Sequence, residues 1–357
     1  NTTQIAIAKN TREISDHEFA TKVMEVLTRT QKTYWSLVAL NKELKVREES
    51  LERAKDFLER IELQVKVGVL APIEITAAKA VIAVREEALI EVRHGINNTQ
   101  DELKALLNRP DAQPGSPVIF ETTDEPVYKK VALRLDLLKE MAFENRRDYM
   151  QASLAIDSKR KELEFNKNQL KWSFNLTGGA TLYGTRGGGK TITDTYTGTT
   201  GTSQLDGSVA DAGSDMASGR YYDLSVGLVA EYPLYNRKAK SNVAKNVMEL
   251  SQAETRFMSL RQGIEVEVLS ASRAVKTAEQ KIHASRASSV LAEKKLEAET
   301  KKYDVGASTI FTVLEYQNDL AAAQSKEINA VTDYIKALAQ LDLATGMVLK
   351  KHNVSIE

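Results

Sequence analysis

Side chains that could bind a metal or act as nucleophiles do not gather in this sequence. The histidines are His17, His94, His283 and His352, and no two have the His-x3-His spacing that places metal ligands on one helix face. Cysteine is absent, which excludes disulfides, thiolate metal sites and cysteine nucleophiles. No Ser-His-Asp set or carboxylate pair stands out among the 49 acidic residues. The sequence therefore predicts no enzyme, no metal and no cofactor.

Nucleotide and nucleic-acid chemistry are also disfavoured. Gly187-Gly-Gly-Lys-Thr191 has the residue types of a phosphate loop, but it lacks the four-residue spacing between glycines and the helix that should follow. Lysine and arginine number 49, as do aspartate and glutamate, so the chain carries no excess positive charge to attract nucleic acid. The remaining candidate residues are those that could form a binding surface.

Two glycine-containing turns interrupt long helical patterns. They are Val67-Gly68-Val69 and Val305-Gly306-Ala307. Glycine serves as a C-terminal helix stop, and it also exposes backbone that a partner can approach closely. Ordinary turn chemistry and a docking surface are both open at this point.

Polar residues follow the second turn at helical spacing. Thr312, Glu315 and Asp319 share roughly one helix face, and Glu74 follows the first turn at a similar place. Acids are favoured at a helix N-terminus in any case, so a solvated helix start is the alternative to a functional acidic site.

Most of the chain reads as long helices. The predicted spans are Asp16–Lys66, Ile73–Leu107, 131–170 with a break near Asn145–Asp148, Lys238–Tyr303 and Ile310–Ala344. A coiled-coil stripe at 3/4 spacing, interrupted by Arg47, comprises Leu44, Leu51, Ala54, Leu58, Ile61 and Val65. At 1.5 Å per residue the longest helix would reach ~100 Å, which suggests a fibrous bundle or a tube. Residues 109–130 hold four of the six prolines and predict a linker.

Two segments, 171–183 and 221–233, have the period of two that indicates β-strands. Their even-numbered positions are mostly apolar: Trp172, Phe174, Leu176, Ala180, Leu182, Tyr222, Leu224, Val226, Leu228, Ala230 and Tyr232. Each is long enough for a tilted strand to cross a bilayer, and aromatic residues stand at the ends, as in membrane barrels. The pattern also allows an ordinary hairpin packed on a helix. Residues 184–220, which hold nine of the 18 glycines, predict an exposed, mobile loop.

The chain contains an internal repeat. Gly68 and Gly306 lie 238 positions apart, and the same offset superposes Phe19 on Phe257 and Val26 on Ile264. We therefore predict a partial first repeat over 1–125, with its turn at 67–72. The second repeat is predicted over 126–357, with its turn at 304–309. The offset maps the second strand to positions before Asn1, so a helix and a hairpin of the first repeat are expected upstream.

Three motifs in this order resemble those of the TolC-like outer-membrane efflux proteins. Lys66–Glu74 and Tyr303–Glu315 resemble the family's helix tips, a Val-Gly pair followed by a helix restart. Glu144-Asn-Arg-Arg-Asp148 resembles the Asn-Arg-Pro-Asp entry to the second repeat, with Arg147 in place of proline. Tyr232-Pro-Leu-Tyr235 resembles the exit from the last strand, although Asn236-Arg237 stand where glycine usually follows.

The resemblance implies a mainly α fold in which long antiparallel coiled-coil hairpins form a tunnel, and a β-hairpin contributes to a trimeric transmembrane barrel. In this family each protomer of a homotrimer supplies four strands to a twelve-stranded barrel, and this chain supplies two of them. The implied location is the bacterial outer membrane, with the helical tunnel in the periplasm. The implied partners are outer-membrane lipid, a periplasmic adaptor (membrane fusion protein) and an inner-membrane pump.

The resemblance also assigns roles to residues. The tips Val67, Gly68, Val69, Val305, Gly306 and Ala307 would dock the adaptor. Thr312 and Glu315 would line the pore constriction, where three glutamates form an acidic ring that favours cations. The lipid-facing set would be Trp172, Phe174, Leu176, Leu182, Leu224, Val226 and Leu228. The function implied is the exit duct of a tripartite efflux or type I secretion system; the alternative is a soluble coiled-coil scaffold or adaptor with a small β insert.

Overall fold

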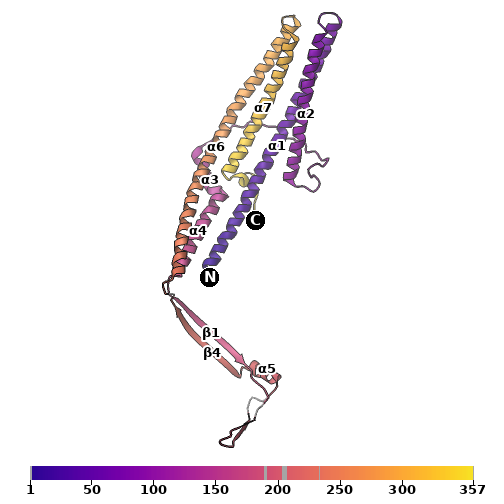
Figure 1. The fold of residues 1–357 in the computed structure, drawn as a ribbon. Helices are drawn as coiled ribbons and strands as arrows, with labels where there is room; N and C mark the ends of the chain where they lie inside the picture. Colours follow the sequence, from indigo (N-terminus) through magenta and orange to yellow (C-terminus); the bar gives the residue numbers. More distant parts are fainter. Residues whose placement is uncertain (1, 189–190, 203–206, 233, 357) are drawn as a thin grey trace. The chain divides into compact units, whose positions relative to one another are not determined.

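The structure, a computed structural model, describes residues 2–188, 191–202, 207–232 and 234–356 (Figure 1). The chain forms two compact units. The larger unit comprises residues 4–157 and 252–357, and the smaller unit consists chiefly of residues 158–251.

The larger unit is built on two helical hairpins that turn at the same end (Figure 1). Helices α1 (Thr2–Lys66) and α2 (Ile73–Leu107) form the first, and α6 (Arg237–Asp304) and α7 (Ile310–Ala344) form the second. The predicted bounds of α2 and α7 are confirmed, and α6 extends one residue beyond its prediction at each end. Helix α1 begins well before the predicted Asp16 because its polar first turns are held by packing: Asn10 is buried and donates to Asp157 at 2.7 Å.

The predicted coiled-coil stripe of α1 forms part of the core. Ala54 and Ile61 are fully buried, while the interrupting Arg47 is half-buried and paired with Glu43 at 3.2 Å. The second hairpin has its own apolar seam, in which small and β-branched residues of α6 pack against α7. This seam comprises Ile264, Val268, Ala271, Val275, Ala278, Ile282, Ala330, Tyr334, Leu341 and Ala344.

The helical segment predicted over 131–170, with a break near Asn145–Asp148, forms two helices, α3 (Leu135–Asn145) and α4 (Arg147–Asn168). Residues 131–134, predicted as helix, are not helical. Arg146 is extended between them, and its guanidinium pairs with Asp148 at 2.7 Å and with Glu267 of α6 at 2.6 Å. It also donates to the carbonyl oxygen of Ala344 at the end of α7. The break near Asn145–Asp148 is therefore a junction of four helices, α3, α4, α6 and α7, held together by one arginine.

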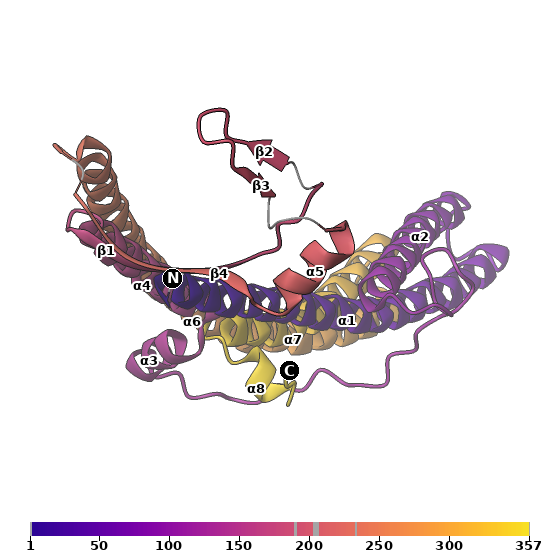
Figure 2. The same ribbon diagram turned by 90° about the horizontal axis from the view of Figure 1, so that it is seen from below.

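Residues 109–134, here called the strap, contain no helix or strand and cross both hairpins (Figure 2). Side-chain hydrogen bonds tie the strap to every long helix of the larger unit. They join Tyr34 to Asp124, Asn41 to Thr122, Gln100 to Phe120, Glu279 to Tyr128, and Tyr334 to the carbonyl oxygen of Lys129. The hydrogen bond to Glu279, together with burial, raises the pKa of Tyr128 to about 12.

Helix ends recur at the offset seen in the sequence. Helices α1 and α6 end at Lys66 and Asp304, and α2 and α7 end at Leu107 and Ala344. After α2 comes left-handed Asn108 (φ 45°), and after α7 comes left-handed Gly346 (φ 69°), 238 positions later. These spacings, of 238 or 237 positions, support the division into repeats over 1–125 and 126–357, which remains our proposal. The short helix α8 (Val348–Lys351) follows Gly346.

In the smaller unit, β1 (Ser173–Tyr183) pairs antiparallel with β4 (Tyr221–Glu231). The strands are shorter than the predicted 171–183 and 221–233, and Pro233 lies outside the described residues. In this register Leu176 opposes Leu228 and Ala180 opposes Leu224. Even-numbered residues therefore oppose even-numbered residues, and both strands present their apolar positions on one face.

The segment 184–220, which was predicted as an exposed, mobile loop, contains secondary structure of its own. It contains β2 (Thr191–Thr193) paired with β3 (Thr200–Thr202), and helix α5 (Val209–Ala217). Ser208 and Asp211 form a capping box at the start of α5, and Arg186 pairs with the buried Asp215 at 2.7 Å. Glycine content alone did not reveal these contacts, because capping and a buried ion pair stabilise structure that propensity disfavours.

The exit from β4 has a backbone conformation that favours glycine. Tyr235 and Asn236 have left-handed φ values of 65° and 35°. A bulky residue in this region is strained, whereas glycine adopts it freely. Asn236 gains a partial compensation, since its side-chain amide donates to the carbonyl oxygen of Gln169 at 3.0 Å.

Candidate functional site

Both helix tips have the same backbone design. Gly68 (φ 80°) donates to the carbonyl oxygen of Val65 at 3.0 Å, and Val69 to that of Gln64 at 2.9 Å. Gly306 (φ 76°) and Ala307 make the equivalent bonds, at 2.9 and 2.8 Å, to Tyr303 and Lys302. This is the Schellman arrangement, which closes the carbonyls at a helix C-terminus.

The tips expose apolar side chains. Val67 is 72% exposed, Val69 70% and Val305 79%, and Ala307 is exposed as well. The first residues after the turns add Ile73 and Phe311, which are equally open. The six residues predicted to dock an adaptor thus lie on the surface, on a backbone that the Schellman bonds hold rigid.

Beneath the tips the two hairpins share one apolar cluster, formed by Phe57, Ile61, Ala78, Ile310, Val313 and Leu314. The Tyr303 hydroxyl donates to the Gln64 side chain at 2.7 Å, and the Tyr303 ring packs edge-on against Phe57. The tip of one hairpin is therefore coupled to the tip of the other through direct contacts.

The turns themselves are fastened differently. In the first, the half-buried Leu70 packs on the cluster that contains the fully buried Ile61. In the second turn, Glu299 and Ser308 stand 238 positions after Ile61 and Leu70. The Ser308 hydroxyl donates to the Glu299 carboxylate at 2.7 Å. Lys302 also pairs with Glu299 at 3.0 Å. These bonds lower the pKa of Glu299, the serine bond most.

The predicted constriction residues have separate surroundings. Thr312 is half-buried and takes part in the helix cap, with its hydroxyl 2.8 Å from that of Thr309. Glu315 is exposed. Asp319 pairs with Lys295 of α6 at 3.4 Å, and the Lys295 ammonium lies 3.7 Å from the centre of the Tyr316 ring. Glu315 and Asp319 are both exposed, but of these two only Asp319 has an ion pair within the described part of the chain.

Sequence reasoning missed Arg85, which joins both hairpins. It is 6% exposed and donates to the Ser50 carbonyl oxygen at 2.6 Å, the Gln317 side chain at 3.1 Å and the Leu314 carbonyl oxygen at 3.1 Å. Burial, and secondarily the charge of Arg53, lowers its pKa to about 10. A signal was present: Arg85 interrupts the buried row Ala78, Ile82, Leu89 and Val92 of α2.

The β-hairpin presents an apolar face that the described residues of its own unit leave exposed. Leu176 is 77% exposed, Val226 75% and Leu228 73%. The other residues of the predicted lipid-facing set are exposed too: Trp172, Phe174, Leu182 and Leu224. A two-stranded ribbon is at best marginally stable alone, so this face calls for further partners.

Aromatic rings cluster at the ends of the hairpin. Trp172 stacks on Tyr232 with ring centres 4.8 Å apart, and on Phe174 at 6.3 Å. Tyr183 opposes Tyr221 at the other end of the ladder. Such rings suit an interface at which one side of the ring is apolar and the other is wet.

The histidines stay apart in space as in sequence. His17 lies near Arg147, His94 near Asn98 and His283 against Tyr128. Among the described residues, no group of acids and histidines could hold a metal ion, and no helix carries an apolar stretch of membrane-spanning length. Gly189 and Lys190 of the glycine-rich segment lie outside the described residues.

The sequence matches the profile of the family described as Outer membrane efflux protein over residues 1–109 and 138–347. No curated protein sequence matches the chain. The fold is that of solved outer-membrane channels. The channel OprN matches with a TM-score of 0.77 and 13% identity, covering 97% of this chain and 71% of that one.

Two further channels have the same fold. VceC from Vibrio cholerae matches with a TM-score of 0.75 and 15% identity, over 97% of this chain and 75% of that chain. CmeC from Campylobacter jejuni matches with a TM-score of 0.70 and 17% identity, over 97% of this chain and 69% of that chain. The predicted mainly α fold with an antiparallel β-hairpin is confirmed, and these relatives are channels rather than enzymes. With the family profile matched over most of its length, this chain belongs to the outer membrane efflux protein family.

Proposed function

We propose that the chain is one protomer of a trimeric outer-membrane channel that serves as the exit duct of a tripartite efflux or type I secretion system. The observation that carries the proposal is the even-numbered face of β1 and β4, apolar along its whole length and exposed. In a barrel this face meets lipid, and its strand edges pair with strands from elsewhere in the assembly.

A soluble scaffold accounts poorly for this face. Large apolar patches on soluble proteins are limited in size because they promote association. The opposite, odd-numbered face is mostly small or polar: it holds Asn175, Thr177, Gly179, Ser225 and Asp223, with Val229 and the terminal Tyr183 and Tyr221 as exceptions. Small polar residues on one face and large apolar residues on the other suit a wall between water and hydrocarbon.

The tips are the proposed docking surface for a periplasmic adaptor. Their exposed valines offer apolar contact, and their rigid turns reduce the conformational entropy that binding would otherwise cost. The same proposal places the helical tunnel in the periplasm and an inner-membrane pump beyond the adaptor.

Glu315 is the proposed acid of the pore constriction, with Thr312 beside it on the same turn. Three copies around a threefold axis would form an acidic ring that favours cations. Like charges repel, so the ring cannot hold the entrance closed; contacts between helices must do so. The buried bridge from Arg85 to Leu314 and Gln317 joins the hairpins one turn from Glu315 and is suited to that task.

Extraction and conductance together test the proposal. The protein should require detergent for extraction from membranes, run as a trimer after cross-linking and conduct ions in planar bilayers. Glu315→Gln should reduce cation selectivity with little effect on assembly, and Arg85→Met should increase the time spent open. A monomer that is soluble without detergent would contradict the duct. Unchanged selectivity in Glu315→Gln would contradict only the acidic ring.

A further inference from the structure

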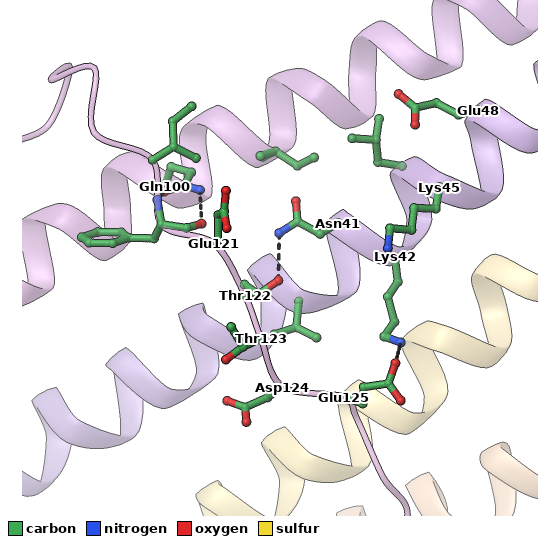
Figure 3. A pocket seen from close by; sticks show the side chains of 15 residues that line it. Asn41, Lys42, Lys45, Glu48, Gln100, Glu121, Thr122, Thr123, Asp124 and Glu125 are labelled. Carbon is green, nitrogen blue, oxygen red and sulfur yellow. Dashed lines mark hydrogen bonds and ion pairs between the residues drawn. The ribbon is translucent and has the colours of Figure 1, made fainter.

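A cavity of about 570 Å³ lies between the strap and the α1/α2 hairpin (Figure 3). Helix α1 contributes Asn41, Lys42, Lys45 and Glu48, and the strap contributes residues 119–125. The aliphatic side chains of Val38, Leu44 and Ile96 also line it, of which Val38 is 2% exposed. A concave site with apolar surface and a few polar groups is the usual form of a small-molecule pocket.

The walls of this cavity are fixed by the protein itself. The Gln100 side chain donates to the Phe120 carbonyl oxygen at 2.8 Å and accepts from its N–H at 3.0 Å. Asn41 donates to the Thr122 hydroxyl at 3.1 Å, so its side-chain oxygen remains available as an acceptor (Figure 3). A pocket held in this way loses little entropy on binding.

Most charged groups around the cavity already have partners. Lys42 pairs with Glu125 at 3.1 Å, Glu48 with Arg93 at 3.1 Å, and Asp124 accepts from the Tyr34 hydroxyl at 2.5 Å. Two lining charges have no ion pair or hydrogen bond within the described part of the chain: the Lys45 ammonium on α1 and the Glu121 carboxylate on the strap. They belong to different walls and carry opposite signs.

We propose that this cavity binds a small zwitterion, an amino acid or a short peptide. The ligand carboxylate would pair with Lys45 and the ligand ammonium with Glu121. An aliphatic side chain would lie against Leu44 and Ile96, and the Asn41 oxygen would accept a ligand N–H. The two free charges select a ligand that bears both signs, because a ligand with one charge leaves the other wall group unpaired. This site is independent of the duct function.

The affinity should be modest and sensitive to salt. Lys45 and Glu121 are both exposed, so water and ions screen the two contacts. A dissociation constant in the millimolar range at low salt is expected, weakening as salt is added.

The test pairs ligand changes with side-chain changes on the full-length purified protein, measured by saturation-transfer NMR and titration. The probes are alanine, trialanine, N-acetyl-trialanine and trialanine amide. Removing one charge from trialanine should weaken binding to the native protein about two- to fivefold. Glu121→Gln should bind trialanine and N-acetyl-trialanine equally weakly, and Lys45→Gln should do the same for trialanine and trialanine amide. Alanine distinguishes the two classes of ligand. Alanine that binds the native protein as tightly as trialanine does indicates a free amino acid, and alanine that binds more weakly indicates a peptide.

Both variants replace exposed side chains and should fold, which helical circular dichroism would check. Lys55→Gln, on α1 but away from the cavity, is the matched control and should bind as the native protein does. Absence of saturable trialanine binding at millimolar concentrations would overturn the proposal. So would binding that is equal in native, Lys45→Gln and Glu121→Gln protein.

Discussion

The two helix tips share a backbone but not the contacts that fasten it. Each turns through a left-handed glycine with the same pair of hydrogen bonds. The first turn rests on apolar packing of Leu70 in the cluster of Ile61, whereas the second is held by the bond from Ser308 to Glu299. Turn geometry can thus persist across a repeat while the interactions beneath it change from apolar to charged. Loss of the Glu299 carboxylate, by substitution or by acid, should therefore affect the second tip alone, whereas truncation in the shared apolar cluster should affect both tips.

The largest expected effect comes from Ile61→Ala. Ile61 is fully buried in the cluster that joins both hairpins, and such a truncation costs about 2–5 kcal/mol. Hydrogen exchange should show lost protection at both tips. Glu299→Gln should loosen residues 299–309 alone, because its partners Ser308 and Lys302 are local. Equal loss at both tips in the two variants would remove the distinction between them.

Glycine substitutions should affect the tips alike. A Cβ at Gly68 or at Gly306 would meet no atom within 4 Å, so alanine at either adds backbone strain alone, about 1 kcal/mol. Gly346→Ala should cost more, since its Cβ would come 2.8 Å from the Asn145 backbone. Gly263 lies inside α6 with open space around it, so Gly263→Ala should increase the free energy of unfolding. Urea unfolding followed by circular dichroism measures all four, and a large difference between the two tip variants would contradict the shared design.

Acid should weaken the second tip selectively, and this is the smallest effect. The pKa of Glu299 is lower in the folded chain than its ordinary value of 4.5. Its contribution to stability is therefore complete above pH 4.5 and is lost as the pH falls through the lowered value. Hydrogen exchange at residues 299–309 should rise in acid relative to the first turn at 67–72, and Glu299→Gln should abolish the difference. An equal rise in hydrogen exchange at both turns of the native chain in acid would contradict a selective role of Glu299.

Much of the helical architecture was predictable because periodicity and helix stops are local. The bounds of α2 and α7 and both glycine turns follow from spacing alone. The even-numbered face of the hairpin was equally readable, since the side-chain period of a strand fixes it.

What escaped prediction depends on contacts distant in sequence. Arg85 bridges to Ser50 and Gln317, and Arg146 joins α6 to the end of α7. The hydrogen bonds of the strap and the elements formed within 184–220 likewise depend on pairings that no local pattern encodes. A charge within an apolar row, as at Arg85, was the one warning available.

The roles of the tip, constriction and lipid-facing residues remain proposals that the fold supports through exposure and rigidity. The hairpin face bears most directly on the central claim, that this chain lines an outer-membrane duct. The decisive comparison is Val226→Arg against Ser225→Arg, neighbours on β4 with opposite faces. If even-numbered residues meet lipid, Val226→Arg should destabilise the assembled trimer by about 2–4 kcal/mol near the midplane, and Ser225→Arg by much less. Equal trimer stability of the two variants, measured by thermal dissociation in membranes, would contradict the account.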